Sequence, residues 1–198
     1  MTLVLASTSQ SRRAMLTAAG VTHEALASGV DEDPVKQALI ARAAPPRDIA
    51  DALAELKAVK VSLMIPPALV LGGDSVVALD DGRLLDKPES REQAAEHLRM
   101  LSGRTHDLWS AAVIAEQGRA VWRFVDRARL TMRPLSEVFI QDYLDAEWPA
   151  IAGCVGCYRM EGPGVQLFAR VQGSHFTILG MPMLQILDYL RTRGEMTS

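Results

Sequence analysis

Hydrophobic positions along the chain change their spacing several times, which predicts a mixture of strands and helices. Residues 3–6 form a short apolar run, a polar stretch follows at residues 7–11, and helix-forming residues continue through residues 12–19. This order predicts a strand, a polar loop and a helix, because the composition changes at each boundary. Ser9 or Ser11 is placed to cap the first turn of that helix.

Apolar residues recur every three or four positions through residues 49–63, which predicts a long amphipathic helix. Lys57 falls off this apolar stripe but close to its edge. Pro34 predicts the start of a shorter helix, since proline suits the first helical position. Ser90 and Gln93 have the spacing of a capping box and predict the start of another helix.

Longer apolar runs predict the main strands. Residues 68–79 are apolar apart from the insertion Gly72-Gly73-Asp74-Ser75, a pattern typical of a buried strand with a polar interruption. Further strands are predicted at residues 109–115, 120–132 and 165–171, and further helices at residues 136–146 and after Pro182. The turn-forming Gln117-Gly118 suggests antiparallel neighbours, so the sequence predicts an α/β or α+β fold with a mixed sheet.

Composition narrows the class of protein. The 198 residues contain no internal repeat and no linker, so we expect one domain over residues 1–194 and a short tail at residues 195–198. Hydrophobic residues make up 48% and charged residues 23%, as in ordinary globular proteins and unlike disordered or collagen-like chains. A net charge of -3 argues against a long nucleic acid partner but leaves room for a small anion in one cleft.

The apolar runs do not indicate a membrane protein. The longest one, residues 63–71, contains Pro66 and Pro67 and is far shorter than the ~20 residues that a membrane span requires. The first residues lack the basic leader of a signal peptide. We therefore expect a cytoplasmic protein.

The two cysteines, Cys154 and Cys157, have a C-x-x-C spacing that is compatible with a redox pair or with half of a zinc site. No other cysteine supplies a second half-site, and Gly153 and Gly156 indicate a loop. Ordinary reduced thiols are the favoured interpretation, and redox or metal chemistry are the alternatives. The four histidines are scattered without a ligand-like pair, so we assign them to the surface or to helix packing.

Residues 7–13, Ser-Thr-Ser-Gln-Ser-Arg-Arg, are the first candidate for chemistry. A helix N-terminus after a strand presents free backbone N–H groups and a partial positive charge, which suits phosphate oxygens. Arg12 and Arg13 add paired donors in a rigid fork. The alternative is a capped helix with a solvated basic start.

Asp74 is the second candidate, because a carboxylate within a buried strand is costly unless a metal or another cation accepts it. The alternative is an aspartate in a turn at a strand end. Lys57, Lys87 and the acidic triplet 31–33 are each more often surface residues than site residues. Together they supply what metal-assisted attack on a phosphoryl group needs: carboxylates for the cation, a base for water, and positive charge around the phosphates.

The order of these motifs resembles the Maf-like nucleoside triphosphate pyrophosphatases. The matching pieces are L-A-S-T-S-x-x-R-R at residues 5–13, G-D-S at 73–75, K-P at 87–88 and L-S-G-R-T-H at 101–106. Later segments at residues 152–153, 160–162 and 180–183 look like further motifs of that family. The resemblance implies an elongated fold whose central sheet is flanked by helices, with a cleft between two lobes, in a protein that is often a homodimer.

The resemblance also implies an activity and its residues. It implies cleavage between the α and β phosphates of non-standard or modified nucleotides, with Mg or Mn as the cofactor. Asp74 would be the catalytic base or a metal-bound carboxylate, and Glu32 a second acidic member of the metal site. The residues that would hold the triphosphate are Ser7, Ser9, Arg12, Arg13, Lys57 and Lys87.

Departures from the family pattern concern specificity. Ser75 stands where Thr or Gln is typical, and Gln10 replaces a proline. Glu161 resembles the branch that acts on 7-methyl-GTP, where an acidic side chain can accept from the guanine N1–H and N2 amine. Ser11 occupies a position where that branch has a tryptophan able to stack on the base. The functional alternatives are a nucleotide-binding regulator without turnover, of the division-inhibitor type, and a redox protein using Cys154 and Cys157.

Overall fold

A computed structural model describes residues 3–197 of the chain. The strands are β1 (Leu3–Leu5), β2 (His23–Ala25), β3 (Leu69–Leu79), β4 (Leu84–Leu85), β5 (Thr105–Glu116), β6 (Arg119–Met132) and β7 (Phe168–Gln172). The helices are α1 (Gln10–Ala18), α2 (Asp33–Ala41), α3 (Pro46–Met64), α4 (Arg91–Leu101), α5 (Glu137–Glu147), α6 (His175–Ile178) and α7 (Met183–Thr192). Two 3-10 turns are η1 (Ala150–Gly153) and η2 (Pro163–Leu167). Ser198, at the end of the predicted tail, lies outside the described residues.

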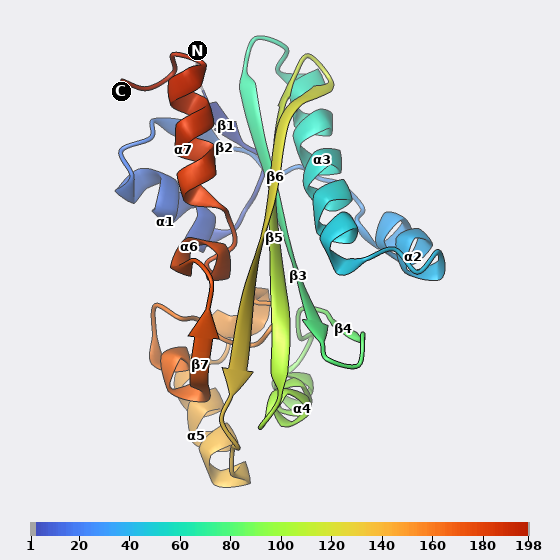
Figure 1. Cartoon of the computed structure of the whole chain (residues 1–198), viewed down its shortest axis with the longest axis vertical. Helices are drawn as coiled ribbons and strands as arrows, with labels where there is room; N and C mark the ends of the chain where they lie inside the picture. The colour runs from blue at the N-terminus through green and yellow to red at the C-terminus, as the bar shows by residue number, and fades with distance from the viewer. Residues whose placement is uncertain (1–2, 198) are drawn as a thin grey trace. The chain divides into compact units, whose positions relative to one another are not determined.

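The described strands form a seven-stranded mixed sheet with the order β2-β1-β3-β5-β6-β7, and β4 pairs with β3 (Figure 1). β1 is parallel to both β2 and β3, whereas β3 with β4 and β6 with β7 are antiparallel. The prediction of an α/β fold with a mixed sheet and flanking helices is confirmed.

The chain divides into two compact units. Unit 1 consists of residues 1–75, 110–126 and 180–198, and unit 2 consists of residues 76–109 and 127–179. In unit 1, α3 covers one face of the sheet, and α1 and α7 cover the other (Figure 1). Neighbouring residues of β6 show this sidedness: Arg123 forms ion pairs with Asp51 and Glu55 of α3, while Trp122 stacks on Tyr189 of α7.

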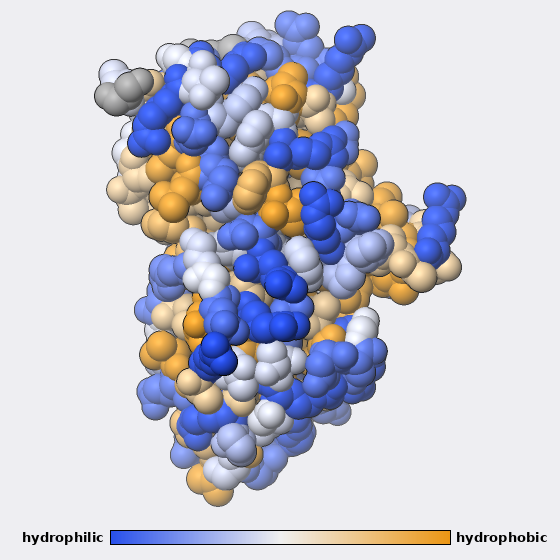
Figure 2. Space-filling view, in the orientation of Figure 1, coloured by the Kyte–Doolittle hydropathy of each residue, from blue (hydrophilic) through white to orange (hydrophobic). Residues whose placement is uncertain are grey.

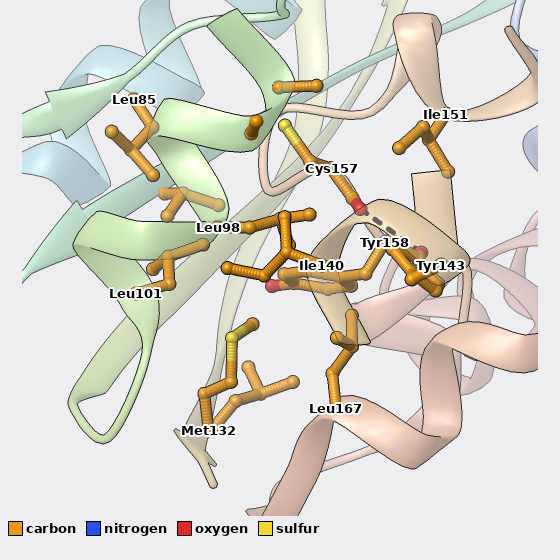
Figure 3. Packing of buried hydrophobic residues seen from close by; sticks show 14 of the residues in the cluster. Leu85, Leu98, Leu101, Met132, Ile140, Tyr143, Ile151, Cys157, Tyr158 and Leu167 are labelled. Atoms are coloured by element: carbon orange, nitrogen blue, oxygen red, sulfur yellow. Dashed lines mark hydrogen bonds between the residues drawn. The ribbon is translucent and has the colours of Figure 1, made fainter. Parts of the chain in front are cut away.

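Unit 2 has its own apolar core, formed by α4, α5, the adjoining parts of β3, β5 and β6, and the segment that follows α5. Figure 3 shows Leu98 and Leu101 of α4 facing Ile140 of α5, with Tyr158 and Leu167 beside them. The Tyr143 hydroxyl donates to the carbonyl oxygen of Cys157 at 3.1 Å, which ties the segment after α5 back to that helix.

Capping residues begin several helices where the sequence predicts. The side chain of Ser9 caps α1 by accepting from the backbone N–H of Arg12, and Ser90 caps α4 by accepting from Gln93. The predicted strand at residues 165–171 is only partly correct, because Pro163–Leu167 forms a 3-10 turn and β7 begins at Phe168. The short strand β2 was not predicted from its sequence His-Glu-Ala, which carries no strand pattern.

The visible surface alternates polar and apolar groups, and hydrophilic side chains dominate it (Figure 2). No helix within residues 3–197 is long and apolar enough to cross a membrane.

Candidate active site

Close packing of α3 against β3 creates the candidate site in unit 1. A Cβ atom added at Gly72 would lie 2.3 Å from the carbonyl oxygen of Ala54 and 2.7 Å from the backbone nitrogen of Ala58. Only glycine therefore lets the helix lie this close to the strand. Lys57 follows on the same buried face of α3 and is 7% exposed, so its predicted place off the apolar stripe is wrong. Small alanines, which a pattern of large apolar residues does not register, make up much of this face.

The ammonium group of Lys57 joins two carboxylates. Its Nζ atom donates to Oδ1 of Asp74 at 2.7 Å and lies 2.8 Å from Oε2 of Glu32, the residue that precedes α2. The side chain of Asp74 is 12% exposed, whereas that of Glu32 is 35% exposed. The three residues come from distant parts of the sequence, and the fold brings their charged ends to one point. The expectation that a buried Asp74 would have a cationic partner is thereby confirmed.

Glu32 and Asp74 have the chemistry of a divalent cation site. Both present carboxylate oxygens toward the same positive group, and such oxygens are the ligands that Mg²⁺ and Mn²⁺ prefer. Within residues 3–197 no cluster of three or more His, Cys, Asp or Glu side chains has a metal-binding arrangement. Mg²⁺ is usually bound through one or two carboxylates plus substrate phosphates, so the pair fits this mode rather than a closed protein cage.

Arg12 is fixed by three groups of unit 1. Its guanidinium donates from Nε to the carbonyl oxygen of Gly180 at 3.0 Å, from Nη2 to the Ser75 hydroxyl at 3.0 Å, and from Nη1 to the Ser7 hydroxyl at 3.4 Å. Burial lowers the pKa of Arg12, while the charges of Asp74 and Glu32 act in the opposite direction. The arginine therefore lies within electrostatic reach of both carboxylates.

The remaining predicted residues of the first motif lie around the start of α1. Ser7 accepts a hydrogen bond from the backbone N–H of Ser9 at 3.2 Å, and Ser9 caps the helix. Ser11 is half-buried in the first turn, and Arg13 is exposed. The loop thus presents hydroxyls and a helix N-terminus beside Arg12, as an anion site would.

Ser75 contacts Arg12 and a second serine. Its hydroxyl lies 3.0 Å from that of Ser110, a fully buried residue of β5. A Cβ atom at Gly180, where φ is +110°, would lie 3.3 Å from Nε of Arg12 and 3.5 Å from the Ser75 hydroxyl. Ser110 and Gly180 therefore help to hold Arg12. The sequence signals Gly180, which lies in one of the late motifs of the family resemblance. It gives no signal for the role of Ser110, which lies in an apolar run.

Lys87 and Glu161 belong to unit 2 and are both exposed. Their charges act on the Cys154 thiol: burial and, to a smaller extent, the charge of Glu161 raise its pKa to about 11, while Lys87 acts in the opposite direction. Lys87 and Glu161 are thus described within unit 2, whereas the charged cluster around Asp74 belongs to unit 1.

Comparison with known proteins identifies the family. A sequence model described as Maf-like protein matches residues 2–193. The chain belongs to the Maf-like protein family. It is 53% identical over 194 residues to a nucleoside triphosphate pyrophosphatase of Sphingopyxis alaskensis, with 98% of each chain covered.

Two other relatives of this Maf-like chain have related names, one of them more specific. A protein of Jannaschia sp. named nucleoside triphosphate pyrophosphatase 1 is 50% identical over 192 residues, covering 97% of this chain and 96% of the relative. A protein of Rhizobium meliloti named 7-methyl-GTP pyrophosphatase is 47% identical over 192 residues, with the same coverage.

The two cysteines of this Maf-like chain are free thiols. Cys157 is fully buried, its Sγ lies 3.5 Å from Nδ1 of His97, and burial raises its pKa to about 12. The raised pKa values keep both cysteines protonated at neutral pH. Because the thiolate is the reactive form, both thiols are weakly nucleophilic. This state favours the interpretation of Cys154 and Cys157 as ordinary reduced thiols.

Proposed function

We propose that this Maf-like protein is a nucleoside triphosphate pyrophosphatase that hydrolyses the α–β phosphoanhydride, releasing the monophosphate and diphosphate. The observation that carries the proposal is the convergence of Asp74, Glu32 and Lys57 in unit 1, with Arg12 within electrostatic reach. A buried carboxylate with an adjacent cation and an anion-binding helix end supplies a base and phosphate ligands together. The names of the relatives from Sphingopyxis and Jannaschia support the same reaction.

In this proposal Asp74 accepts the proton of the attacking water. Arg12, Arg13, Lys57 and the N-terminus of α1, with the hydroxyls of Ser7 and Ser9, bind the phosphate oxygens, and Lys87 contributes a further positive charge. Positioned cations and N–H groups stabilise the charge that develops during phosphoryl transfer.

Charge balance supports a divalent cation in the reaction. The carboxylates of Glu32 and Asp74 offset the positive charges of Lys57 and Arg12, so these four groups alone provide no net attraction for a triphosphate. Glu32 and Asp74 would hold Mg²⁺ or Mn²⁺, which supplies charge neutralisation at the phosphoryl oxygens when it is bound. We propose this metal requirement as part of the function.

Specificity is proposed to depend on Glu161, with Ser11 and Ser75 as further determinants. An acidic side chain can accept hydrogen bonds from the N1–H and N2 amine of guanine, and the relative from Rhizobium meliloti is named 7-methyl-GTP pyrophosphatase. Ser75 contacts Arg12 and Ser110, so it can influence specificity through the position of the arginine. Methylated guanine nucleotides are therefore candidate substrates beside other non-standard nucleotides.

The deciding experiment is diphosphate release from a panel of nucleoside triphosphates that includes 7-methyl-GTP, measured with Mg²⁺, with Mn²⁺ and with a chelator. We expect turnover that requires the metal and differs between bases. Binding of a nucleotide without diphosphate release would instead support the nucleotide-binding regulator. We also propose that the enzyme acts in the cytoplasm and that it forms a homodimer. Analytical ultracentrifugation tests the dimer by measuring its mass.

A further inference from the structure

An ion pair in unit 2, with one fully buried partner, lies outside the residues assigned so far. Glu147, the last residue of α5, is only 3% exposed, and Arg159 follows it by twelve positions. Arg159 donates from Nε to Oε2 of Glu147 at 2.9 Å and from Nη2 to Oε1 at 3.1 Å. Two parallel hydrogen bonds fix the orientation of a guanidinium group as well as its position. A carboxylate this buried depends on such a partner.

Arg159 begins the turn that carries Glu161. The backbone N–H of Gly162 donates to the carbonyl oxygen of Arg159 at 3.2 Å, which closes the turn over residues 159–162. The N–H of Val165 then donates to the carbonyl oxygen of Gly162 at 3.2 Å and leads into η2. Glu161 therefore lies on a short turn whose first residue is held by the side chain of Glu147.

Two glycines bring the backbone of this turn close to Arg159 and Glu147. A Cβ atom at Gly164 would lie 2.5 Å from the carbonyl oxygen and 2.8 Å from the nitrogen of Arg159. A Cβ atom at Gly162 would lie 3.7 Å from Nη2 of Arg159 and from both carboxylate oxygens of Glu147. The backbone at Gly164 thus packs directly on that of Arg159, and Gly162 lies in contact range of the paired side chains. Loss of the ion pair would leave the backbone of residues 159–162, which carries Glu161, less firmly held.

We propose that Glu147 and Arg159 are positioning residues that hold the turn of residues 159–162 and thereby set base selectivity through Glu161. This inference rests on the proposed function, because selectivity has meaning only if the enzyme hydrolyses nucleotides. The physical reason is preorganisation: an exposed carboxylate recognises N–H donors best when its backbone is already fixed. Glu161 also acts electrostatically on Arg159, which shows that the two side chains are near each other.

Selective loss of discrimination is the expected signature. In Arg159→Met and Glu147→Gln, the ratio of kcat/KM between the best and poorest bases should fall by about tenfold, the scale of one lost pocket contact. The loss should appear in KM for the preferred base, while kcat for the poorest base stays within about twofold. Arg159→Lys keeps the charge but not the two-point geometry, so it should restore the ratio only in part.

A matched control is available in the same unit. Arg99 forms a similar pair with Glu137, but their side chains are 46% and 56% exposed. Arg99→Met removes an arginine from a surface pair, so it should leave base selectivity unchanged. Thermal unfolding of every variant checks that the comparison is made between folded proteins. If Arg159→Met fails to fold, Glu147→Gln and Arg159→Lys provide the same comparison.

Combination with Glu161→Gln tests whether the pair acts through Glu161. Adding Glu161→Gln to Arg159→Met should change the selectivity little further, because Arg159 acts on selectivity only by positioning Glu161. Additive effects, an equal fall in kcat for all bases, or a wild-type ratio in both Arg159→Met and Glu147→Gln would each overturn the inference. An unchanged ratio in Glu161→Gln alone would also overturn it, whereas absence of diphosphate release from the wild-type protein would refute the proposed function.

Discussion

Nζ of Lys57 lies 2.7 Å from Oδ1 of Asp74 because Gly72, two positions before Asp74, lets the helix α3 lie directly on the strand β3. The contact joins α3 to β3 and recruits Glu32 at 2.8 Å. A change at Gly72 should therefore act on the charged cluster without touching any charged residue. Gly72→Ala should lower the stability by about 1–3 kcal/mol, because the new methyl group overpacks the helix backbone. Its turnover should fall as α3 moves and Lys57 leaves Asp74.

Gly153→Ala is the matched control for this change. A Cβ atom at Gly153 would meet nothing within 4 Å, so the same substitution should leave unfolding and turnover close to wild type. Urea unfolding and diphosphate release measure both quantities. Equal stability of the two variants would contradict the close packing at Gly72.

Asp74→Asn should reduce turnover by at least about two orders of magnitude, the usual scale for a positioned general base. The amide keeps the size of the side chain but accepts no proton from water. Circular dichroism and the midpoint of thermal unfolding should show an intact fold. Asp188→Asn, a change at an exposed position of α7, should retain wild-type turnover. A wild-type rate in Asp74→Asn would remove Asp74 from the proposed mechanism.

Lys57→Met should increase the stabilisation that a divalent cation provides. Without the ammonium group, Glu32 and Asp74 lose the cation that joins them, and their repulsion favours binding of Mn²⁺. The midpoint of thermal unfolding should therefore rise more with Mn²⁺ in this variant than in the wild type, although turnover falls. Lys60→Met, on the same helix, should respond like the wild type. A smaller rise in Lys57→Met would argue against metal binding between the two carboxylates.

Ser75→Ala should raise KM for the triphosphate by about 2- to 10-fold, the effect of one hydrogen bond worth about 0.5–1.5 kcal/mol. The substitution removes an acceptor that fixes Arg12, so substrate binding is affected more than the chemical step. Gly180→Ala should act in the same direction, because its Cβ would crowd the guanidinium at a φ of +110°. Steady-state kinetics measure the effect, and a fall in kcat alone would contradict a role in holding Arg12.

His106 predicts a loss of stability in mild acid. It is 1% exposed, its Nε2 lies 3.0 Å from the Tyr158 hydroxyl, and burial lowers its pKa to about 4. The unfolded chain takes up a proton near pH 6.5, whereas the folded protein does so only near pH 4. Stability should therefore decrease as the pH falls through this window. His106→Gln, which does not titrate, should show a shallower decrease in urea unfolding between pH 7 and pH 4.5. An identical slope would contradict this source of acid sensitivity.

Local signals in the sequence were sufficient to predict the longer helices and strands and the need for a partner at Asp74, but they missed β2 and the start of β7. Ser9 and Ser90 cap helices because capping depends on residues within one turn. A carboxylate inside a buried apolar strand requires a cation or hydrogen-bond donors as partners. The prediction for Asp74 could therefore be made without knowing any tertiary contact. The roles proposed for the other motif residues come from the resemblance to the Maf-like family and stay predictions.

The sequence by itself determined where the longer helices and strands lie, which family the chain resembles, and which residues are candidates for phosphate chemistry. Only the tertiary structure decided that Lys57 is buried against Asp74, that Ser75 holds Arg12, and that Glu147 pairs with Arg159. These contacts join different elements, so they depend on how closely the backbones pack. Spacing along the chain describes one helix or strand at a time and carries no measure of the distance between them.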